Sequence, residues 1–154
     1  MSEMLEKILS DNNIKIAYKR VYANKGAGGV DGIAINELEE YMREHWQGIK
    51  QEIRERKYKP QPVLRVEIPK PNGGTRLLGI PTVLDRVIQQ AIAQELNIIY
   101  DNKFSENSFG FRPRRDAKGA IKKAESYINE GYRWVVDIDL EKFFDKVNHD
   151  ILMY

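Results

Sequence analysis

The chain has 154 residues, of which 42% are hydrophobic and 31% charged, a balance typical of a globular domain with its own core. It holds no run of about 18 apolar residues, and its first residues lack the pattern of a signal peptide, so we expect no membrane association. The absence of cysteine excludes disulfides and thiolate metal sites and fits a reducing cytoplasm.

The net charge is only +2, but its distribution is uneven. Residues 57–123 hold 13 Lys and Arg against 6 Asp and Glu, a net charge of +7, and the rest of the chain is therefore acidic. A basic middle followed by an acidic segment suits a polyanion bound beside a metal site, with a randomly uneven surface as the alternative.

Two short amphipathic helices are predicted over residues 4–21, with a break near residues 11–13. Residues 24–32 contain four glycines and are expected to form a loop. This loop lacks the Gly-Lys-Ser/Thr ending of a P-loop, so Lys25 and the backbone amides around it are either a phosphate contact or part of a flexible connector. A further helix is predicted from a capping box at Asn36 to about Arg56, bent or split by Gly48.

A β-hairpin is predicted next, with strands over residues 63–68 and 75–78 around the turn at residues 71–74. Lys70 precedes the turn and Arg76 follows it, so two cations of different geometry should lie near the tip. They could hold a triphosphate, and the alternative is that they only keep the hairpin soluble.

Two helices flank an unusual loop after the hairpin. The first should be capped by Thr82 and remain in the core to about Tyr100, and the second should run from about Asp116 to Gly131. Between them, residues 104–115 mix aromatic, glycine and arginine residues, a composition suited to nucleic-acid backbones and stacked bases.

Residues 134–140 predict a strand, because aliphatic residues alternate with Asp137 and Asp139. The two carboxylates would share one face, roughly 7 Å apart, and the aliphatic side chains would be buried on the other. Such a pair can bind a divalent cation such as Mg²⁺, although solvated residues at a strand end show the same pattern. The element order predicts an α+β fold.

Four stretches in the same order resemble the group II intron-encoded reverse transcriptases, also called maturases. They are residues 24–32, residues 66–81, residues 108–113 and residues 136–145. The resemblance implies an N-terminal extension over 1–34, reverse-transcriptase-like fingers over 35–130, and the start of a palm with one strand over 131–154.

The resemblance also implies an RNA-directed DNA polymerase that uses Mg²⁺, dNTPs and an RNA template with a DNA primer, and that binds intron RNA. Asp139 would be the first catalytic carboxylate and metal ligand, with Asp137 as second choice, and Phe144 would contact the sugar of the incoming nucleotide. Phe143 should then be buried and Phe144 partly exposed. Lys70 and Arg76 would bind the triphosphate. The residues expected to contact RNA or template are Lys25, Arg112, Arg114 and Arg115.

The chain stops before the Tyr-x-Asp-Asp turn and the thumb of such an enzyme, so we expect a fragment that is inactive by itself. A non-enzymatic RNA-binding maturase module is the alternative of another class, and a retron-type or diversity-generating reverse transcriptase is the alternative of another lineage. Dimerisation is left open.

Overall fold

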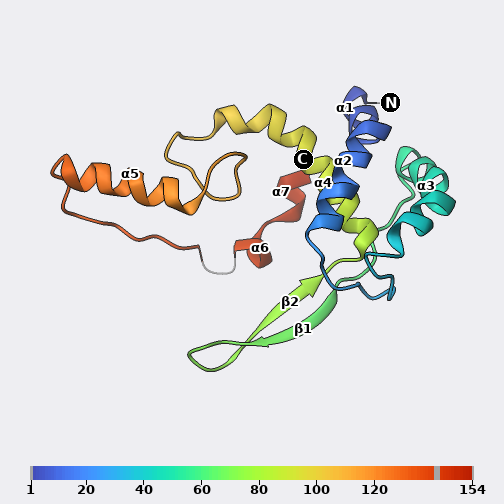
Figure 1. Cartoon of the computed structure of the whole chain (residues 1–154), viewed down its shortest axis with the longest axis horizontal. Coiled ribbons are helices and arrows are strands. Elements are labelled where there is room, and N and C mark those ends of the chain that lie inside the picture. The colour runs from blue at the N-terminus through green and yellow to red at the C-terminus, as the bar shows by residue number, and fades with distance from the viewer. Residues whose placement is uncertain (1, 141–142, 154) are drawn as a thin grey trace. The chain divides into compact units, whose positions relative to one another are not determined.

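The computed structural model describes residues 2–140 and 143–153. These residues form two compact units, the first ending at Phe104 and the second beginning at Ser105. Helices and one antiparallel hairpin make up the regular structure, so the predicted α+β class is confirmed (Figure 1).

The first unit contains most of the helices. Their bounds are α1 (Glu3–Ile8), α2 (Asp11–Ala23), α3 (Leu38–Arg54), α4 (Val83–Tyr100) and the 3-10 turn η1 (Asp101–Lys103). The break between α1 and α2 falls at residues 9–10, earlier than predicted, because the Ser10 hydroxyl caps α2 by accepting the Asn13 amide at 3.3 Å. Of the bend or split predicted at Gly48, the split was wrong, since α3 continues through this residue. The capping box at Asn36 was also wrong, because Glu37 occupies the N-cap position instead.

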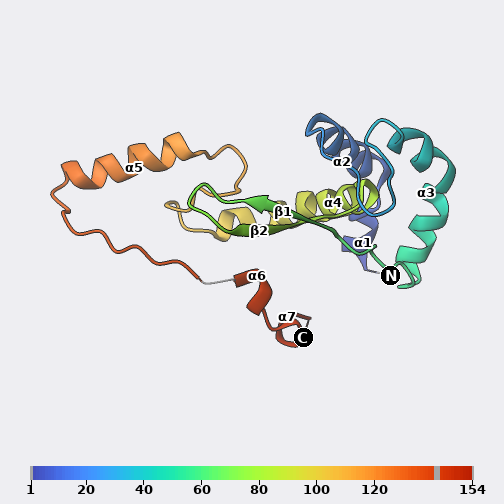
Figure 2. The same cartoon turned by 90° about the horizontal axis from the view of Figure 1, so that it is seen from below.

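The core lies where α2, α3 and α4 meet, and the three helices lie close together in both views (Figures 1 and 2). Its buried apolar side chains are Leu9, Ile14, Ala17, Val21, Leu38, Trp46, Ile49, Val83, Leu84, Val87 and Ala91. The buried Asn13 amide nitrogen donates to the carbonyls of Ile8, at 2.9 Å, and Ala91, at 3.0 Å. Its polar group is therefore satisfied inside the core.

Helix α4 begins as predicted, with the Thr82 hydroxyl accepting the Asp85 amide at 3.1 Å. Its buried side chains lie in the first half, whereas Leu96 and Ile98 in the second half are 40% and 74% exposed. The expectation that the helix stays in the core to Tyr100 was therefore wrong for the second half. A helix closes its own backbone hydrogen bonds, so it can continue beyond the core that stabilises it.

The hairpin consists of β1 (Leu64–Pro69) and β2 (Thr75–Ile80), paired antiparallel from Leu64 opposite Ile80 to Pro69 opposite Thr75. Its turn closes where the Lys70 amide donates to the Gly74 carbonyl at 2.9 Å, and the positive φ angles of Gly73 and Gly74 permit that turn. The hairpin projects from the helices (Figure 1), and Leu77 on it is 64% exposed. The predicted hairpin is confirmed, with each strand slightly shifted or longer than expected.

The second unit carries α5 (Ala117–Asn129), α6 (Phe143–Lys146) and α7 (His149–Met153). Asp116 caps α5 by accepting the Gly119 amide at 2.7 Å, and Gly131 follows the helix with a φ of +99°. In the described part of the chain, no helix combines the length and the hydropathy that crossing a membrane requires.

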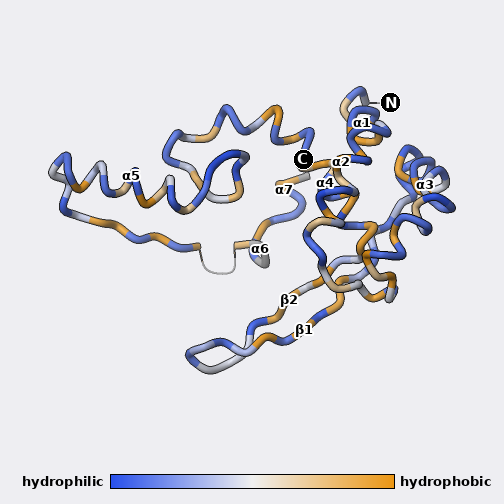
Figure 3. The backbone as a smooth tube through the Cα atoms, viewed as in Figure 1, coloured by the Kyte–Doolittle hydropathy of each residue, from blue (hydrophilic) through white to orange (hydrophobic). Residues whose placement is uncertain are grey.

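Residues 134–140 form no strand, so the predicted palm strand was wrong for this chain. Hydrophobic and hydrophilic residues alternate along the segment (Figure 3), but Trp134 is 95% exposed and Val136 and Ile138 are each 81% exposed. A strand needs a neighbour to satisfy its backbone donors and acceptors. Among the described residues the only strand pairing is that of β1 with β2, so the alternation here has no ladder to join.

Candidate nucleotide and nucleic-acid site

The hairpin tip brings Lys70 and Arg76 to one hollow of about 500 Å³. Ile68, Pro69, Pro71 and Asn72 complete its lining, and none of the lining side chains is acidic. Arg76 pairs with Ile68, whereas Glu67 pairs with Leu77, so the strand alternation places Glu67 on the opposite face of the hairpin. The hollow therefore presents an ammonium and a guanidinium to an anion without a carboxylate from β1 beside them.

Asp137 and Asp139 lie on the exposed segment 134–140 of the second unit. Both carboxylates face solvent, as expected, but so do the aliphatic residues that were expected to be buried behind them. No group of three or more His, Asp or Glu that could hold a metal ion occurs among the described residues. One or two carboxylates suffice for Mg²⁺ where phosphate oxygens and water supply the other ligands, so this pair fits such an ion as part of a larger ligand set.

Phe143 and Phe144 both fall in α6, not at the end of a strand. The side chain of Phe143 is 53% exposed, which contradicts the expectation that it is buried. A short helix turns successive side chains by about 100°, so the strand rule that sent the two rings to opposite sides does not apply. The side chain of Phe144 lies outside the described part of the structure.

The arginine-rich loop, residues 104–115, is stabilised by hydrogen bonds from two of its own arginines. Arg112 Nη1 donates to the carbonyls of Ser105, at 2.8 Å, and Ser108, at 3.1 Å. Arg115 Nη1 donates to the carbonyls of Glu106 and Ser108, and its guanidinium lies 5.4 Å from the centre of the Phe109 ring. These two arginines therefore stabilise the loop itself, a role that the amino-acid composition did not predict.

Arg114 and Phe111 are displayed on the outside of the same loop. Both have left-handed backbone angles, with φ of +60° at Arg114 and +54° at Phe111, and both side chains are exposed. A cation and an aromatic ring presented together suit a phosphate and a stacked base. Of the three arginines predicted to contact RNA, Arg114 is the one most accessible to it.

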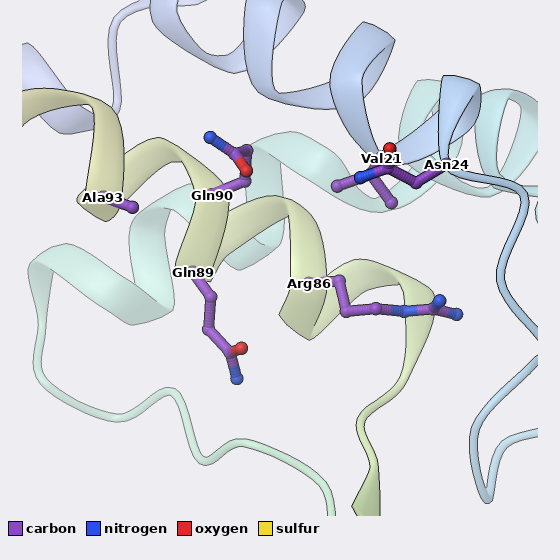
Figure 4. Close-up of a pocket in the computed structure, with 6 residues that line it drawn as sticks. All are labelled: Val21, Asn24, Arg86, Gln89, Gln90 and Ala93. Atoms are coloured by element: carbon purple, nitrogen blue, oxygen red, sulfur yellow. The ribbon is translucent and has the colours of Figure 1, made fainter. Parts of the chain in front are cut away.

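Lys25 lies at the start of the glycine loop, directly after Asn24, which caps the C-terminal end of α2. It is exposed and has a φ of +47°. The neighbouring Asn24 lines an open pocket of about 300 Å³ between the end of α2 and one face of α4 (Figure 4). The pocket is lined by Val21, Asn24, Arg86, Gln89, Gln90 and Ala93, so no acidic side chain lines it.

Asp85, in the first turn of α4, is a buried carboxylate whose contacts outside its own helix the sequence did not predict. It is 3% exposed and accepts hydrogen bonds from the Tyr58 hydroxyl at 2.6 Å, the Gln61 amide at 3.1 Å and the Thr82 hydroxyl at 2.7 Å. Burial, and then the hydrogen bond to this carboxylate, raise the pKa of Tyr58, so the phenol stays protonated as the donor. Because Gln61 lies just before β1 and Thr82 just after β2, Asp85 ties both ends of the hairpin to α4.

Comparisons with known proteins show the family to which the chain belongs. The family described as "Reverse transcriptase (RNA-dependent DNA polymerase)" matches residues 68–154. Protein YkfC of Escherichia coli is 33% identical over 99% of this chain, and the chain covers 42% of that protein. The group II intron-encoded protein LtrA of Lactococcus lactis subsp. cremoris is 37% identical over 90% of this chain, which covers 23% of it.

A putative COX1/OXI3 intron 2 protein of Saccharomyces cerevisiae is 33% identical over 96% of this chain, which spans 17% of its length. The chain thus corresponds to less than half of each of these three relatives. The family match covers more than half of the chain and includes Arg76, Asp139 and the arginine-rich loop. The chain therefore belongs to the reverse transcriptase family, and group II intron-encoded proteins are among its relatives.

Proposed function

We propose that this chain supplies the nucleotide-binding hairpin and the first catalytic carboxylate of an RNA-directed DNA polymerase of a group II intron. The observation that carries the proposal is the hollow at the hairpin tip, where Lys70 and Arg76 meet in a member of the reverse transcriptase family. A dNTP triphosphate is a compact polyanion, and the two cations can bind its oxygens as a point charge and a planar fork.

Asp139, with Asp137 as second choice, would hold Mg²⁺ through carboxylate oxygens on the exposed segment. When bound, Mg²⁺ would neutralise charge on the phosphates and lower the pKa of the primer 3′-hydroxyl. Lys70 and Arg76 would orient the triphosphate, so that the α-phosphorus faces that hydroxyl. Phe144 would form a wall beside the sugar, and the basic loop would bind template phosphates without reading sequence.

The nucleotide role of Arg76 can be tested in a polymerase-active protein that carries this chain. Arg76→Ala should raise the KM for dNTP with little change in Tm, because the residue is exposed. Arg65→Ala is the matched control, since Arg65 lies on the same hairpin but pairs with Gly79 on the opposite face. Equal KM values for the parent and the Arg76 variant would return Arg76 to a solubilising role.

The role of Phe144 as a sugar wall predicts a change in selectivity. Phe144→Val should admit ribonucleotides, because a smaller side chain vacates the volume that a 2′-hydroxyl needs. Phe143→Val is the control, since Phe143 is the exposed neighbour in the same helix. Incorporation of dNTP and rNTP by the three proteins would be compared, and an unaltered ratio in a folded, active Phe144 variant would exclude this role.

RNA binding is proposed for the loop that displays Arg114. Arg114→Ala should weaken binding to RNA and lower the salt slope by roughly 0.7 to 0.9 for each lost phosphate contact. Arg112 and Arg115 are poor first targets, because they also hold loop carbonyls. An Arg114→Ala variant with unchanged affinity and slope would exclude the contact.

The relatives named above favour intron RNA as the ligand over the substrates of retron-type or diversity-generating enzymes. A non-enzymatic maturase module would bind that RNA equally well but would not extend a primer. Primer extension on an RNA template, by a protein in which Asp139 is intact or replaced by Asn, separates the two functions. Extension that depends on Asp139 supports the polymerase, and RNA binding without any extension supports the module.

A further inference from the structure

The glycine loop, residues 24–32, packs closely on the first turn of α4. A Cβ at Gly29 would lie 2.6 Å from the Cα atom and 2.7 Å from the nitrogen of Thr82, distances that backbone atoms cannot accommodate. A Cβ at Gly28 would lie 2.9 Å from the carbonyl oxygen of Ile33. These glycines therefore allow close approach of two backbone segments, so the loop is more than a flexible connector.

The guanidinium of Arg86, on α4, binds this loop. Its Nη2 donates to the carbonyl of Ala27, and its Nη1 occupies the space that a Cβ at Gly26 would need. Its Nε is buried and has no hydrogen-bond partner among the described residues, so packing covers this nitrogen of the guanidinium. Figure 4 shows the side chain reaching from α4 past the end of α2, beside Val21 and Asn24.

Lys25 lies between two fixed points as a result. On one side, the Asn24 amide closes α2 on the Arg20 carbonyl at 3.2 Å, and on the other the Ala27 carbonyl is bound by Arg86. The Lys25 amide itself donates to the Tyr22 carbonyl at 3.3 Å. The backbone at Lys25 is thus held in its left-handed conformation from both directions.

We propose that Arg86 is a positioning residue, which locks the glycine loop on α4 and so sets where Lys25 meets the backbone of a bound nucleic acid. The inference rests on the proposed RNA-binding function, and it assigns to Arg86 a role through Lys25. A preorganised Lys25 binds phosphate without first losing the freedom of a mobile loop, which is why the lock should matter for affinity.

The lock itself can be tested without RNA, by hydrogen exchange of the amides in residues 26–32. Arg86→Ala should speed exchange there, because the Ala27 carbonyl loses its donor. Gly26→Ala should do the same while keeping the charge, because its methyl group displaces the guanidinium. The double variant should exchange no faster than either single one, since both changes open the same lock.

Gly48→Ala is the matched control for Gly26→Ala, because nothing lies within 4 Å of a Cβ at Gly48. It should leave exchange in the glycine loop unchanged. If neither Arg86→Ala nor Gly26→Ala alters exchange in residues 26–32 while both variants remain folded, the lock does not exist.

The effect on Lys25 is tested by RNA binding of the same chain, with a single-stranded RNA as the probe. Lys25→Ala should weaken binding several-fold in the parent but add little in the Gly26→Ala background, because Lys25 is no longer held in place there. Equal effects of Lys25→Ala in both backgrounds would overturn the positioning role. Arg86→Lys keeps a hydrogen-bond donor at this position. The effect of Lys25→Ala on RNA affinity should therefore be larger in the Arg86→Lys background than in the Arg86→Ala background.

Failure of the inference and failure of the proposed function give different results. A parent chain that does not bind RNA would overturn the RNA-binding proposal and with it the role of Arg86 toward Lys25, whatever hydrogen exchange shows. A parent chain that binds RNA through Lys25, with the same affinity loss in every background, would leave the RNA-binding proposal in place and remove only the role of Arg86.

Discussion

The helical core and residues 134–140 have equally clear hydrophobic patterns, but the apolar side chains of the core are buried and those of residues 134–140 are exposed. Leu38, Val83 and Val87 are 0% exposed, whereas Val135 is 89% exposed and Val136 81% exposed. A helix satisfies its backbone hydrogen bonds within its own turns, so it needs only an apolar surface to pack against. A strand must find a neighbour before its apolar face has anything to bury.

The hairpin stands between these two cases. Its turn at Gly73 and Gly74 brings the partner strand back at once, so its ladder forms locally. Its side chains nevertheless stay largely outside the core, as Leu77 at 64% exposed and Leu78 at 41% exposed show. Local pairing is therefore sufficient for strand structure but not for burial.

The largest effect is expected from truncating a core side chain. Leu38→Ala should lower the free energy of unfolding by about 2 to 5 kcal/mol, because it removes buried methyl groups and leaves a cavity. Val136→Ala should change it by less than about 0.5 kcal/mol. Urea unfolding of both variants measures the contrast, and a comparable loss in both would show that residues 134–140 are buried in solution.

The hydrogen bonds of Asp85 should have the next largest effect. Asp85→Asn should cost about 1 to 3 kcal/mol, because the amide cannot accept all the hydrogen bonds from Tyr58, Gln61 and Thr82. Tyr58→Phe removes one of the three donors and should cost about 0.5 to 1.5 kcal/mol. If thermal unfolding shows the Tyr58 variant to be the less stable, the carboxylate is not the centre of this network.

The amphipathic helices, the hairpin and the Thr82 cap could be predicted from the sequence, because each depends on residues close together in the chain. The rest of the Asp85 network could not, since the hydrogen bonds of Asp85 to Tyr58 and Gln61 span 27 and 24 positions. A pattern of apolar residues contains no information about which buried carboxylate will meet which distant donor.

The candidate site shows the same limit. Lys70 and Arg76 could be predicted to lie close together, because a tight turn connects them. The inward use of Arg112 and Arg115 could not be predicted, since composition does not distinguish a guanidinium that binds loop carbonyls from one that faces solvent. The role of Arg86 could not be predicted either, because its hydrogen-bond partner, the Ala27 carbonyl, lies 59 positions away in the chain.

A charge introduced into residues 134–140 should have different effects on the stability of this chain and on primer extension. Val136→Lys should change the free energy of unfolding of this chain by less than about 0.5 kcal/mol, because the side chain already faces water. In a polymerase-active protein that carries the chain, it should abolish primer extension, if the segment joins a sheet there and buries this residue. Ile121→Lys is the control, since Ile121 on α5 is 69% exposed. Full activity of the Val136 variant would show that position 136 stays in water in the active protein.

The smallest effect concerns the ion pairs that connect the first helices. Lys50 lies 2.8 Å from Asp11 and Arg54 lies 2.8 Å from Glu6, so α3 is paired with both α2 and α1. The hydrogen bond from Lys50 lowers the pKa of Asp11, and that from Arg54 lowers the pKa of Glu6. Both carboxylates lie toward solvent, where salt screens such pairs, so the core should outweigh them at every pH.

The sign of their pH dependence follows from the direction of these shifts. A carboxylate whose pKa is lower in the folded chain stabilises it fully above the ordinary values, 3.8 for Asp11 and 4.5 for Glu6, and loses that contribution as the pH falls through the folded pKa. Asp11→Asn should therefore lower Tm slightly at pH 7, and the difference from the parent should shrink as the pH falls through the folded pKa of Asp11 and this carboxylate becomes neutral. The buried stem of Lys50, whose side chain is 11% exposed, should remain packed in both proteins. A Tm difference that does not shrink as the pH is lowered would mean that Asp11 acts through packing or helix capping and not through its charge.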